Sequence, residues 1–221
     1  MSAADTLRCG PVAAAIRRHR LIVVLRHVAP PGAQLDLALA LADAGVRVFQ
    51  VTFDTPAAET DLAGLKACLA GRPDGPFLVG AGAIMRRSQL DSARRAGAEF
   101  AVSPLLDSSL VDVAVSAHLP FIAGAFTPAE VQAAWSAGAT FVQLFPAWAV
   151  GPAFVSALRR PLPEVQLIPA GSVDASNARL YLDAGAAAVG VGDALALADA
   201  AGRRALVEAI TAGATDLEVR A

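Results

Sequence analysis

Eight short apolar runs recur along the chain roughly every 20 to 30 residues, and they constrain the fold more than any other feature. They cover residues 21–26, 46–53, 77–83, 99–103, 120–126, 140–145, 165–171 and 186–192. Each run is nearly continuously apolar rather than alternating, which is typical of strands buried on both faces of a parallel sheet. The stretches between them, such as 35–45, 110–118 and 128–138, carry apolar residues at helical spacing.

The alternation of these runs predicts the fold class. Eight strand-helix units in one chain are typical of an α/β protein with a (β/α)8 TIM barrel. We expect an N-terminal helix over about residues 5–19, a barrel over about 20–196 and a C-terminal helix over about 197–213, all in one domain of residues 1–221. The alternative is an open doubly wound sheet, but the turn RHVAPPGAQ after the first run lacks the glycine-rich phosphate-binding pattern of such sheets.

Glycines mark the expected ends of several helices. Gly45, Gly97, Gly138 and Gly185 each follow an alanine at the end of a helical stretch. Glycine can adopt the left-handed backbone conformation there before the chain enters the next strand.

Charge and composition exclude several classes of function. With 18 basic and 20 acidic side chains the net charge is -2, and no run of like charge indicates a nucleic-acid or membrane partner. Every apolar stretch is broken before it reaches the roughly 18 residues of a membrane-spanning helix. The first residues lack the pattern of a secretory signal, and two cysteines cannot form a disulfide framework. We therefore expect a cytoplasmic protein.

The active site of such a barrel lies at the C-terminal ends of its strands, so polar side chains there are the candidate functional residues. Reading these side chains as pointing inward gives Arg26, Gln50, Thr52, Asp54, Ser103, Thr127, Gln143 and Asp193. The alternative for each is a hydrogen-bonded polar residue at the barrel mouth with no part in function.

A series of sequence strings resembles one enzyme family. The strings are VVLR, QVTFDTP, VGAGAI, AGAEFAVSP, AGAFTPAEV, VQLFPAWAVGP, LIPAGSVDASNARLYLDAG and AVGVGDAL, in this order from about residue 20 to 196. They resemble the 2-keto-3-deoxy-6-phosphogluconate (KDPG) and 4-hydroxy-2-oxoglutarate (KHG) aldolases. The resemblance implies a TIM barrel, a homotrimer, and aldol cleavage that yields pyruvate through a Schiff base.

Both central catalytic groups of that chemistry are replaced here. The resemblance places the family's Schiff-base lysine where this chain has Gln143, and its glutamate base where this chain has Gln50. A primary amide is neither nucleophilic nor basic near neutral pH, so neither glutamine can perform these steps.

The only lysine in the chain is Lys66. It lies beside a helical stripe of leucines, Leu62, Leu65 and Leu69, that we expect to face the barrel. Lys66 is therefore expected on the solvent side of an outer helix, too far from the barrel axis to replace the missing nucleophile.

The resemblance also indicates losses around the substrate. Ala83 and Ala170 stand where the family has threonines that surround the substrate carboxylate, and Pro146 precedes Trp148 in a turn that commonly carries an acidic residue. These changes remove hydroxyl and carboxylate groups and add apolar surface.

The family's phosphate-binding turns are only partly retained. Gly171, Gly190 and Gly192 are present, but Asp193 replaces a serine. A carboxylate there would repel a phosphate. The alternative is that Asp193 caps the following helix.

A metal site is not expected from the residue pattern. Asp54 and Asp193 follow nonadjacent strands, His27 should point away from the axis if Arg26 points inward, and His19 and His118 fall on helices. We therefore expect no metal and no cofactor.

The hypothesis that we favour is a repurposed, less polar small-molecule site that acts without a Schiff base, because aromatic residues gather near a mouth that has lost hydroxyls. Gln143, Gln50 and Asp54 would be its catalytic groups, with Arg26 and Asp54 as a charged pair. Its substrate-binding residues would be Arg26, Thr52, Phe53, Ala83, Ser103, Phe126, Thr127, Phe145, Pro146, Trp148, Ala170, Gly171, Gly192 and Asp193. Core packing is the alternative for the aromatic residues.

Two other functions stay open. One is a noncatalytic trimeric binding or structural homologue. The other is the ordinary KDPG aldolase reaction, which yields pyruvate and glyceraldehyde 3-phosphate. We expect a small-molecule ligand and a homotrimer, and no nucleic-acid or membrane partner.

Overall fold

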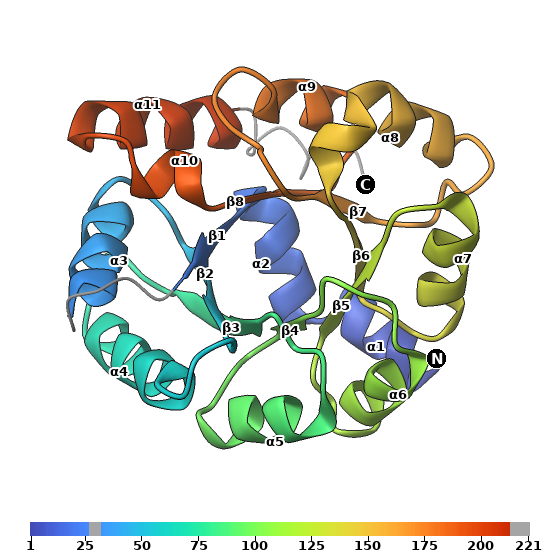
Figure 1. The fold of residues 1–221 in the computed structure, drawn as a ribbon, viewed down its shortest axis with the longest axis horizontal. Coiled ribbons are helices and arrows are strands. Elements are labelled where there is room, and N and C mark those ends of the chain that lie inside the picture. Colours follow the sequence, from blue (N-terminus) through green and yellow to red (C-terminus); the bar gives the residue numbers. More distant parts are fainter. Residues whose placement is uncertain (27–31, 213–221) are drawn as a thin grey trace.

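Eight parallel strands form a barrel in the computed structural model, which describes residues 1–26 and 32–212 (Figure 1). The strands are β1 (Leu21–Leu25), β2 (Val48–Thr52), β3 (Leu78–Gly82), β4 (Ala101–Val102), β5 (Phe121–Ala125), β6 (Phe141–Leu144), β7 (Leu167–Pro169) and β8 (Val189–Val191). They are paired in the order β7-β6-β5-β4-β3-β2-β1-β8. A parallel bridge between Ala170 and Gly190 joins the two ends of this order. The predicted TIM barrel is confirmed.

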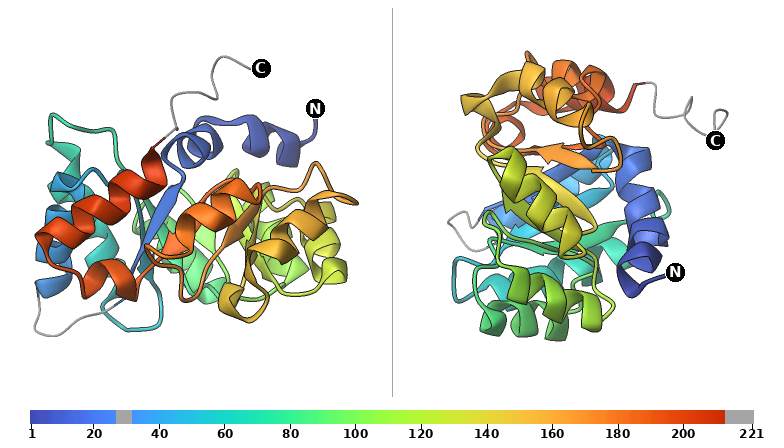
Figure 2. Two further views of the ribbon diagram at one scale, coloured as in Figure 1. Left: turned by 90° about the horizontal axis from the view of Figure 1, so that it is seen from above. Right: turned by 90° about the vertical axis from the view of Figure 1, so that its right-hand side faces the viewer.

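Helices surround the strands and cover one end of the barrel (Figures 1 and 2). The outer ring comprises α3 (Ala33–Asp43), α4 (Ala58–Ala70), α5 (Arg87–Arg95), α6 (Ser108–Ser116), α7 (Pro128–Ser136), α8 (Gly151–Arg159), α9 (Ala178–Asp183), α10 (Asp193–Ala196) and α11 (Ala200–Thr211). Helices α1 (Ala3–Cys9) and α2 (Pro11–His19) lie across the N-terminal ends of the strands. Within the described residues, no helix has the length and apolar character to cross a membrane.

Two expected helix boundaries differ from the structure. The predicted single helix over residues 5–19 is two helices, because Gly10 ends α1 and Pro11 occupies the first position of α2, where its missing N–H is tolerated. The C-terminal segment also divides into α10 and α11, since Asp199 caps a new helix by accepting the N–H of Gly202. Residue 213, the predicted end of the last helix, lies outside the described residues.

The four glycines that were expected to end helices have left-handed backbones. Their φ angles are 103° at Gly45, 84° at Gly97, 104° at Gly138 and 99° at Gly185. A side chain would strain this conformation, so the prediction from the Ala-Gly pairs is confirmed.

The interior of the barrel is filled at its N-terminal end. Ala13 and Ile16 of α2 pack there with buried residues that lie in the strands or directly before them. These residues are Ile22, Val48, Phe100, Val102, Ile122, Phe141, Ile168 and Ala188. Because side chains alternate along a strand, residues two and four positions after these also point inward, toward the C-terminal mouth. Because α2 closes the N-terminal end of the barrel, the C-terminal end is the open one.

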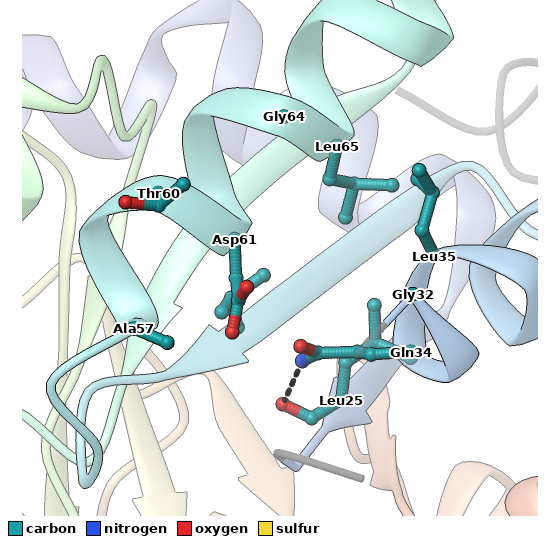
Figure 3. Close-up of a pocket in the computed structure, with 10 residues that line it drawn as sticks. Leu25, Gly32, Gln34, Leu35, Ala57, Thr60, Asp61, Gly64 and Leu65 are labelled. Carbon is teal, nitrogen blue, oxygen red and sulfur yellow. Dashed lines mark hydrogen bonds between the residues drawn. The ribbon is translucent and has the colours of Figure 1, made fainter. Parts of the chain in front are cut away.

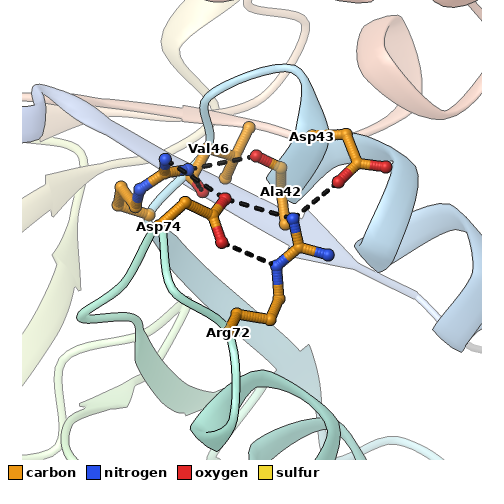
Figure 4. Close-up of polar contacts among 6 residues, drawn as sticks. Ala42, Asp43, Val46, Arg72 and Asp74 are labelled. Carbon is orange, nitrogen blue, oxygen red and sulfur yellow. Dashed lines mark hydrogen bonds and ion pairs between the residues drawn. The ribbon is translucent and has the colours of Figure 1, made fainter.

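A network of charged side chains connects the C-terminal ends of α3 and α4 on the outside of the barrel (Figure 4). Arg72, just after α4, contacts Asp43 at the end of α3 at 2.6 Å and Asp74 at 3.0 Å. Arg47 approaches the other oxygen of Asp74 at 3.4 Å. Both guanidinium groups lie over the ring of Phe77, at 4.9 Å for Arg47 and 5.8 Å for Arg72. The network joins the ends of α3 and α4 far from the open mouth.

Candidate functional site at the barrel mouth

A cavity of about 540 Å³ opens at the C-terminal ends of the strands, which is within the usual range for small-molecule sites. The described residues that line it are Val24, Arg26, Gln50, Thr52, Ala83, Val102, Pro104, Gln143, Phe145, Ala170, Gly171, Ser172, Val173, Asp174, Gly190, Gly192, Asp193, Ala194 and Leu197. Ten of the residues predicted from the sequence are among them: Arg26, Gln50, Thr52, Ala83, Gln143, Phe145, Ala170, Gly171, Gly192 and Asp193.

Small residues at inward positions leave this space open. A Cβ on Gly190 would lie 2.9 Å from the Cβ of Ala170, and a Cβ on Gly82 would collide with the amide of Gln50. A bulkier side chain at either glycine would therefore displace a neighbour that lines the cavity.

Two buried amides face each other across the barrel. Gln50 lies on β2 and Gln143 on β6, with three strands between them in the sheet order. Only 6% of Gln50 and 8% of Gln143 is exposed, and both line the cavity. Within the described residues, neither amide has a hydrogen-bond partner. Because both side chains line the open cavity, solvent or a bound ligand can reach their amides. The two side chains are therefore free to bind a group in the cavity.

Arg26 and Asp54 were predicted as the two charged groups available to a ligand or for a proton transfer. The structure gives Arg26 a partner of its own, since its Nε lies 3.8 Å from Asp193. Barrel closure places β8 beside β1, so Asp193, the second residue after β8, lies near Arg26, the first residue after β1. Both side chains are mostly exposed, 59% for Arg26 and 79% for Asp193.

Asp193 does not cap the helix that it begins. Gly192 is the N-cap of α10, and no side chain caps this helix. The capping alternative is therefore wrong for this aspartate, whose contact is Arg26.

Asp174 is a third charged group of the lining that the sequence analysis missed. Its carboxylate accepts the hydroxyl of Ser176 at 2.6 Å and the backbone N–H of Ser176 at 2.8 Å. These hydrogen bonds hold the pKa of Asp174 below its ordinary value. The cavity mouth thus keeps a second carboxylate ionised near neutral pH.

Several predicted site residues lie outside the cavity lining. Asp54 is exposed just beyond the end of β2. The side chains of Phe53 and Ser103 point away from the barrel axis. Phe53 packs in the core between the strands and the outer helices, and the hydroxyl of Ser103 accepts the N–H of Leu105 at 3.1 Å. Val102 and Pro104 line the cavity in place of Ser103.

The loops after β5 and β6 supply the other residues that do not line the cavity. Thr127 caps α7, where its hydroxyl accepts the N–H of Glu130 at 3.3 Å. Phe126 and Trp148 are 38% and 66% exposed, and Pro146 is partly buried before the short helix η1 (Ala147–Ala149).

The other lining residues that sequence reasoning missed fall into two groups. Val24, Val102 and Pro104 are apolar, and Ser172, Val173, Asp174, Ala194 and Leu197 lie in or after the turns that follow β7 and β8. The alternation of side chains along each strand could have identified Val24 and Val102. The turn residues carry no comparable signal.

Lys66 lies on α4, as predicted, and not at the mouth. Its ammonium donates to the carbonyl oxygen of Gly97 at 2.6 Å and approaches Glu99 at 3.4 Å. This lysine therefore ties α4 to the segment that leads into β4.

A second cavity, of about 280 Å³, lies between α3 and α4 outside the barrel (Figure 3). Leu25, Leu35, Val51 and Leu65 supply much of its apolar lining. Its buried amide, Gln34, donates to the carbonyl oxygen of Leu25 at 3.2 Å. Because this amide already has a partner, the mouth cavity is the stronger candidate for the functional site.

Among the residues that the structure describes, no group of three His, Cys, Asp or Glu side chains could hold a metal ion. The expected direction of His27 cannot be compared, because this residue lies outside the described ranges.

The sequence profile of the KDPG and KHG aldolase family matches residues 12–211. The chain belongs to this family. A KHG/KDPG aldolase of Escherichia coli is 32% identical over 182 residues, which is 82% of this chain and 78% of that protein.

Solved structures of family members have the same fold. A KDPG aldolase of Legionella pneumophila, with pyruvate captured as a covalent carbinolamine intermediate, is 26% identical with a TM-score of 0.76 over 92% of this chain and 98% of that one. A cube-shaped protein cage, designed by fusing symmetric oligomeric domains, is 27% identical with a TM-score of 0.79 over 91% of this chain and 75% of that chain.

Proposed function

We propose that this barrel binds a small molecule at its mouth and acts on it without forming a Schiff base. The observation that supports the proposal most strongly is the pair of buried, unpartnered amides of Gln50 and Gln143, which line a cavity that no lysine reaches. The resemblance to the family implies that these two positions hold the base and the nucleophile in active aldolases.

The chemistry of an amide limits what the two glutamines can do. Each can donate and accept hydrogen bonds, but neither can form an iminium with a keto group or remove a proton near neutral pH. The two amides would then act by orienting the substrate and by forming hydrogen bonds to a polar transition state. Arg26 would orient an acceptor at the rim, and the part predicted for exposed Asp54 stays a prediction.

The lining also fits a less polar ligand than a phosphorylated sugar acid. Val24, Val102, Phe145 and Leu197 contribute apolar surface, while Ala83 and Ala170 offer no hydroxyl. Arg26 is the cationic side chain among the described lining residues, and Asp193 accompanies it.

The second candidate is a noncatalytic trimeric homologue. Exposed apolar side chains lie on the loops that follow four consecutive strands, β3 to β6: Met85, Leu105, Phe126 and Trp148. We propose that this surface binds further copies of this chain. A similar fold serves as a symmetric oligomeric domain in the designed cage. Light scattering tests this assembly: Trp148→Asp should yield monomers, whereas Leu180→Asp, a change at another exposed leucine, should leave the trimer intact.

The third candidate is the ordinary aldolase reaction that the names of the relatives describe. The missing lysine and glutamate oppose it. We propose a cytosolic location for each of these functions, with which the two exposed, unpaired cysteines agree.

A turnover assay tests the proposed function. The protein is mixed with 4-hydroxy-2-oxoglutarate or with 2-keto-3-deoxy-6-phosphogluconate, and the release of pyruvate is followed. We expect no release above the uncatalysed rate, while the E. coli relative in the same assay serves as the positive control. Enzyme-dependent release of pyruvate would contradict the proposal.

A further inference from the structure

We propose that the mouth cavity selects an uncharged ligand with both hydrogen-bond donors and acceptors, of the carboxamide type, over carboxylate or phosphate anions. This inference rests on the proposed function, since it concerns the ligand of the same site. It follows from the charges at the mouth and from the hydrogen-bonding capacity of the two amides.

The charges at the mouth disfavour an anion. Of the described residues that line the cavity, three carry charge: Arg26, Asp174 and Asp193. Their sum is one positive and two negative charges, or -1. The guanidinium of Arg26 lies 3.8 Å from Asp193 and is mostly exposed, so its attraction for an anion is offset by this neighbour and screened by solvent. A bound anion would meet the uncompensated carboxylate of Asp174.

Hydrogen bonds to the carboxylate of Asp174 keep it in its charged form. The hydroxyl and N–H of Ser176 both donate to it, at 2.6 and 2.8 Å. These donors favour the ionised form and lower the pKa of Asp174. The negative charge at the rim is therefore permanent at neutral pH.

The two amides require donors as well as acceptors from the ligand. Each carries one carbonyl oxygen that accepts and one NH2 group that donates, and this holds whichever way the amide is turned. Gln50 and Gln143 are more than nine-tenths buried and have no partner within the described residues. A carboxylate or a phosphomonoester dianion supplies acceptors alone and would leave both carbonyl oxygens without a donor from the ligand. A carboxamide can satisfy an NH2 group and a carbonyl oxygen together.

Two small probes that differ mainly in charge test this selection. Pyruvate and pyruvamide have the same carbon skeleton, and the carboxylate of one is replaced by a carboxamide in the other. Their binding to the full chain, and that of methyl phosphate, a phosphomonoester, is measured by ligand-observed NMR titration. We expect pyruvamide to bind about tenfold more tightly than either anion, which corresponds to repulsion by one nearby charge at a partly solvated site.

Variants locate the binding and identify its cause. Gln143→Leu should weaken pyruvamide binding roughly fivefold by removing one hydrogen-bonding group. The double variant Asp174→Asn with Asp193→Asn should reduce the preference for pyruvamide over pyruvate and leave the part that comes from the two amides. Asp112→Asn removes a carboxylate on the exposed side of α6 and should preserve the preference. Urea unfolding of each variant verifies that it is folded.

Three results would overturn the inference: pyruvate or methyl phosphate binding as tightly as pyruvamide, no detectable binding of pyruvamide, or pyruvamide binding that the folded Gln143→Leu variant retains in full. The proposed function fails on a different result. Enzyme-dependent release of pyruvate from an aldol substrate would contradict that function, whichever probe binds more tightly.

Discussion

The side-chain amide of Gln50 occupies the space that a methyl group on Gly82 would fill. Gly82 ends β3 and pairs with Thr52 of the neighbouring strand β2, so its missing side chain lets the amide of Gln50 lie across the sheet. The glycine thus positions a residue that it is not bonded to.

Replacing Gly82 by alanine should weaken ligand binding more than folding. The new methyl group displaces the end of a flexible side chain, so we expect a loss of about 1 kcal/mol in the free energy of unfolding, the lower end for overpacking. Binding of pyruvamide should fall roughly fivefold, because one hydrogen-bonding group leaves its place. Urea unfolding and NMR titration of the same sample measure both.

Gly64→Ala is the matched control for this change. A Cβ on Gly64 meets nothing within 4 Å, and the residue lies inside α4. We expect a gain of about 0.5–1 kcal/mol in stability from the higher helix propensity of alanine, with binding at the mouth unchanged. Equal binding losses in the two variants would rule out the specific role of Gly82.

Restoring the two lost groups should restore some of the family's chemistry. We expect the double variant Gln143→Lys with Gln50→Glu to release pyruvate from 4-hydroxy-2-oxoglutarate at a measurable rate, because a lysine and a carboxylate would again face each other across the cavity. The single variants should be much less active. Complete inactivity of a folded double variant would show that other changes, such as Ala83 and Ala170, also prevent the reaction.

Thr127 should contribute to stability and not to binding. Its hydroxyl accepts the N–H of Glu130, and the Glu130 carboxylate accepts the N–H of Thr127 at 2.8 Å, so the two residues form a capping box. Thr127→Ala should lower the free energy of unfolding by about 1 kcal/mol, while Thr127→Ser keeps most of it. If Thr127→Ala abolished binding without a change in stability, the original prediction of a substrate contact would be the better one.

Acid should remove the stabilising effect of Asp74. Hydrogen bonds from Arg72 hold the pKa of Asp74 below its ordinary value of 3.8. A lowered pKa in the folded state means that the stabilisation is present above about pH 3.8 and is lost as the pH falls through the folded value. The free energies of unfolding of the wild type and of Asp74→Asn, measured in urea, should therefore differ at neutral pH, with the wild type more stable. The two values should converge in acid. A difference that stays constant with pH would contradict this account.

The sequence was sufficient to predict the barrel and part of its mouth. The continuous apolar runs fixed the strands, and the period of two placed Gln50, Thr52 and Gln143 on the inward side. Phe53 and Ser103 were assigned to the mouth because they lie near strand ends, although their register directs them away from the axis. A stricter use of the alternation would have removed both.

Other features depend on contacts between distant parts of the chain. Arg26 meets Asp193 only because barrel closure brings β8 beside β1, and Asp174 enters the lining through the turn after β7. The division of the N-terminal helix was readable in Gly10 and Pro11, a stop followed by a preferred first helical residue, but the prediction of a single helix did not use this signal.

The most direct test of the central claim is reductive trapping with pyruvate. The wild-type protein and the Gln143→Lys with Gln50→Glu variant are each incubated with pyruvate and borohydride, and their intact masses are measured. The account predicts an unchanged mass for the wild type and a reduced pyruvate adduct on the variant, because only the variant places an amine at the barrel axis. An adduct on the wild-type protein that maps to Lys66, or to a group at the mouth, would contradict the claim that this barrel acts without a Schiff base.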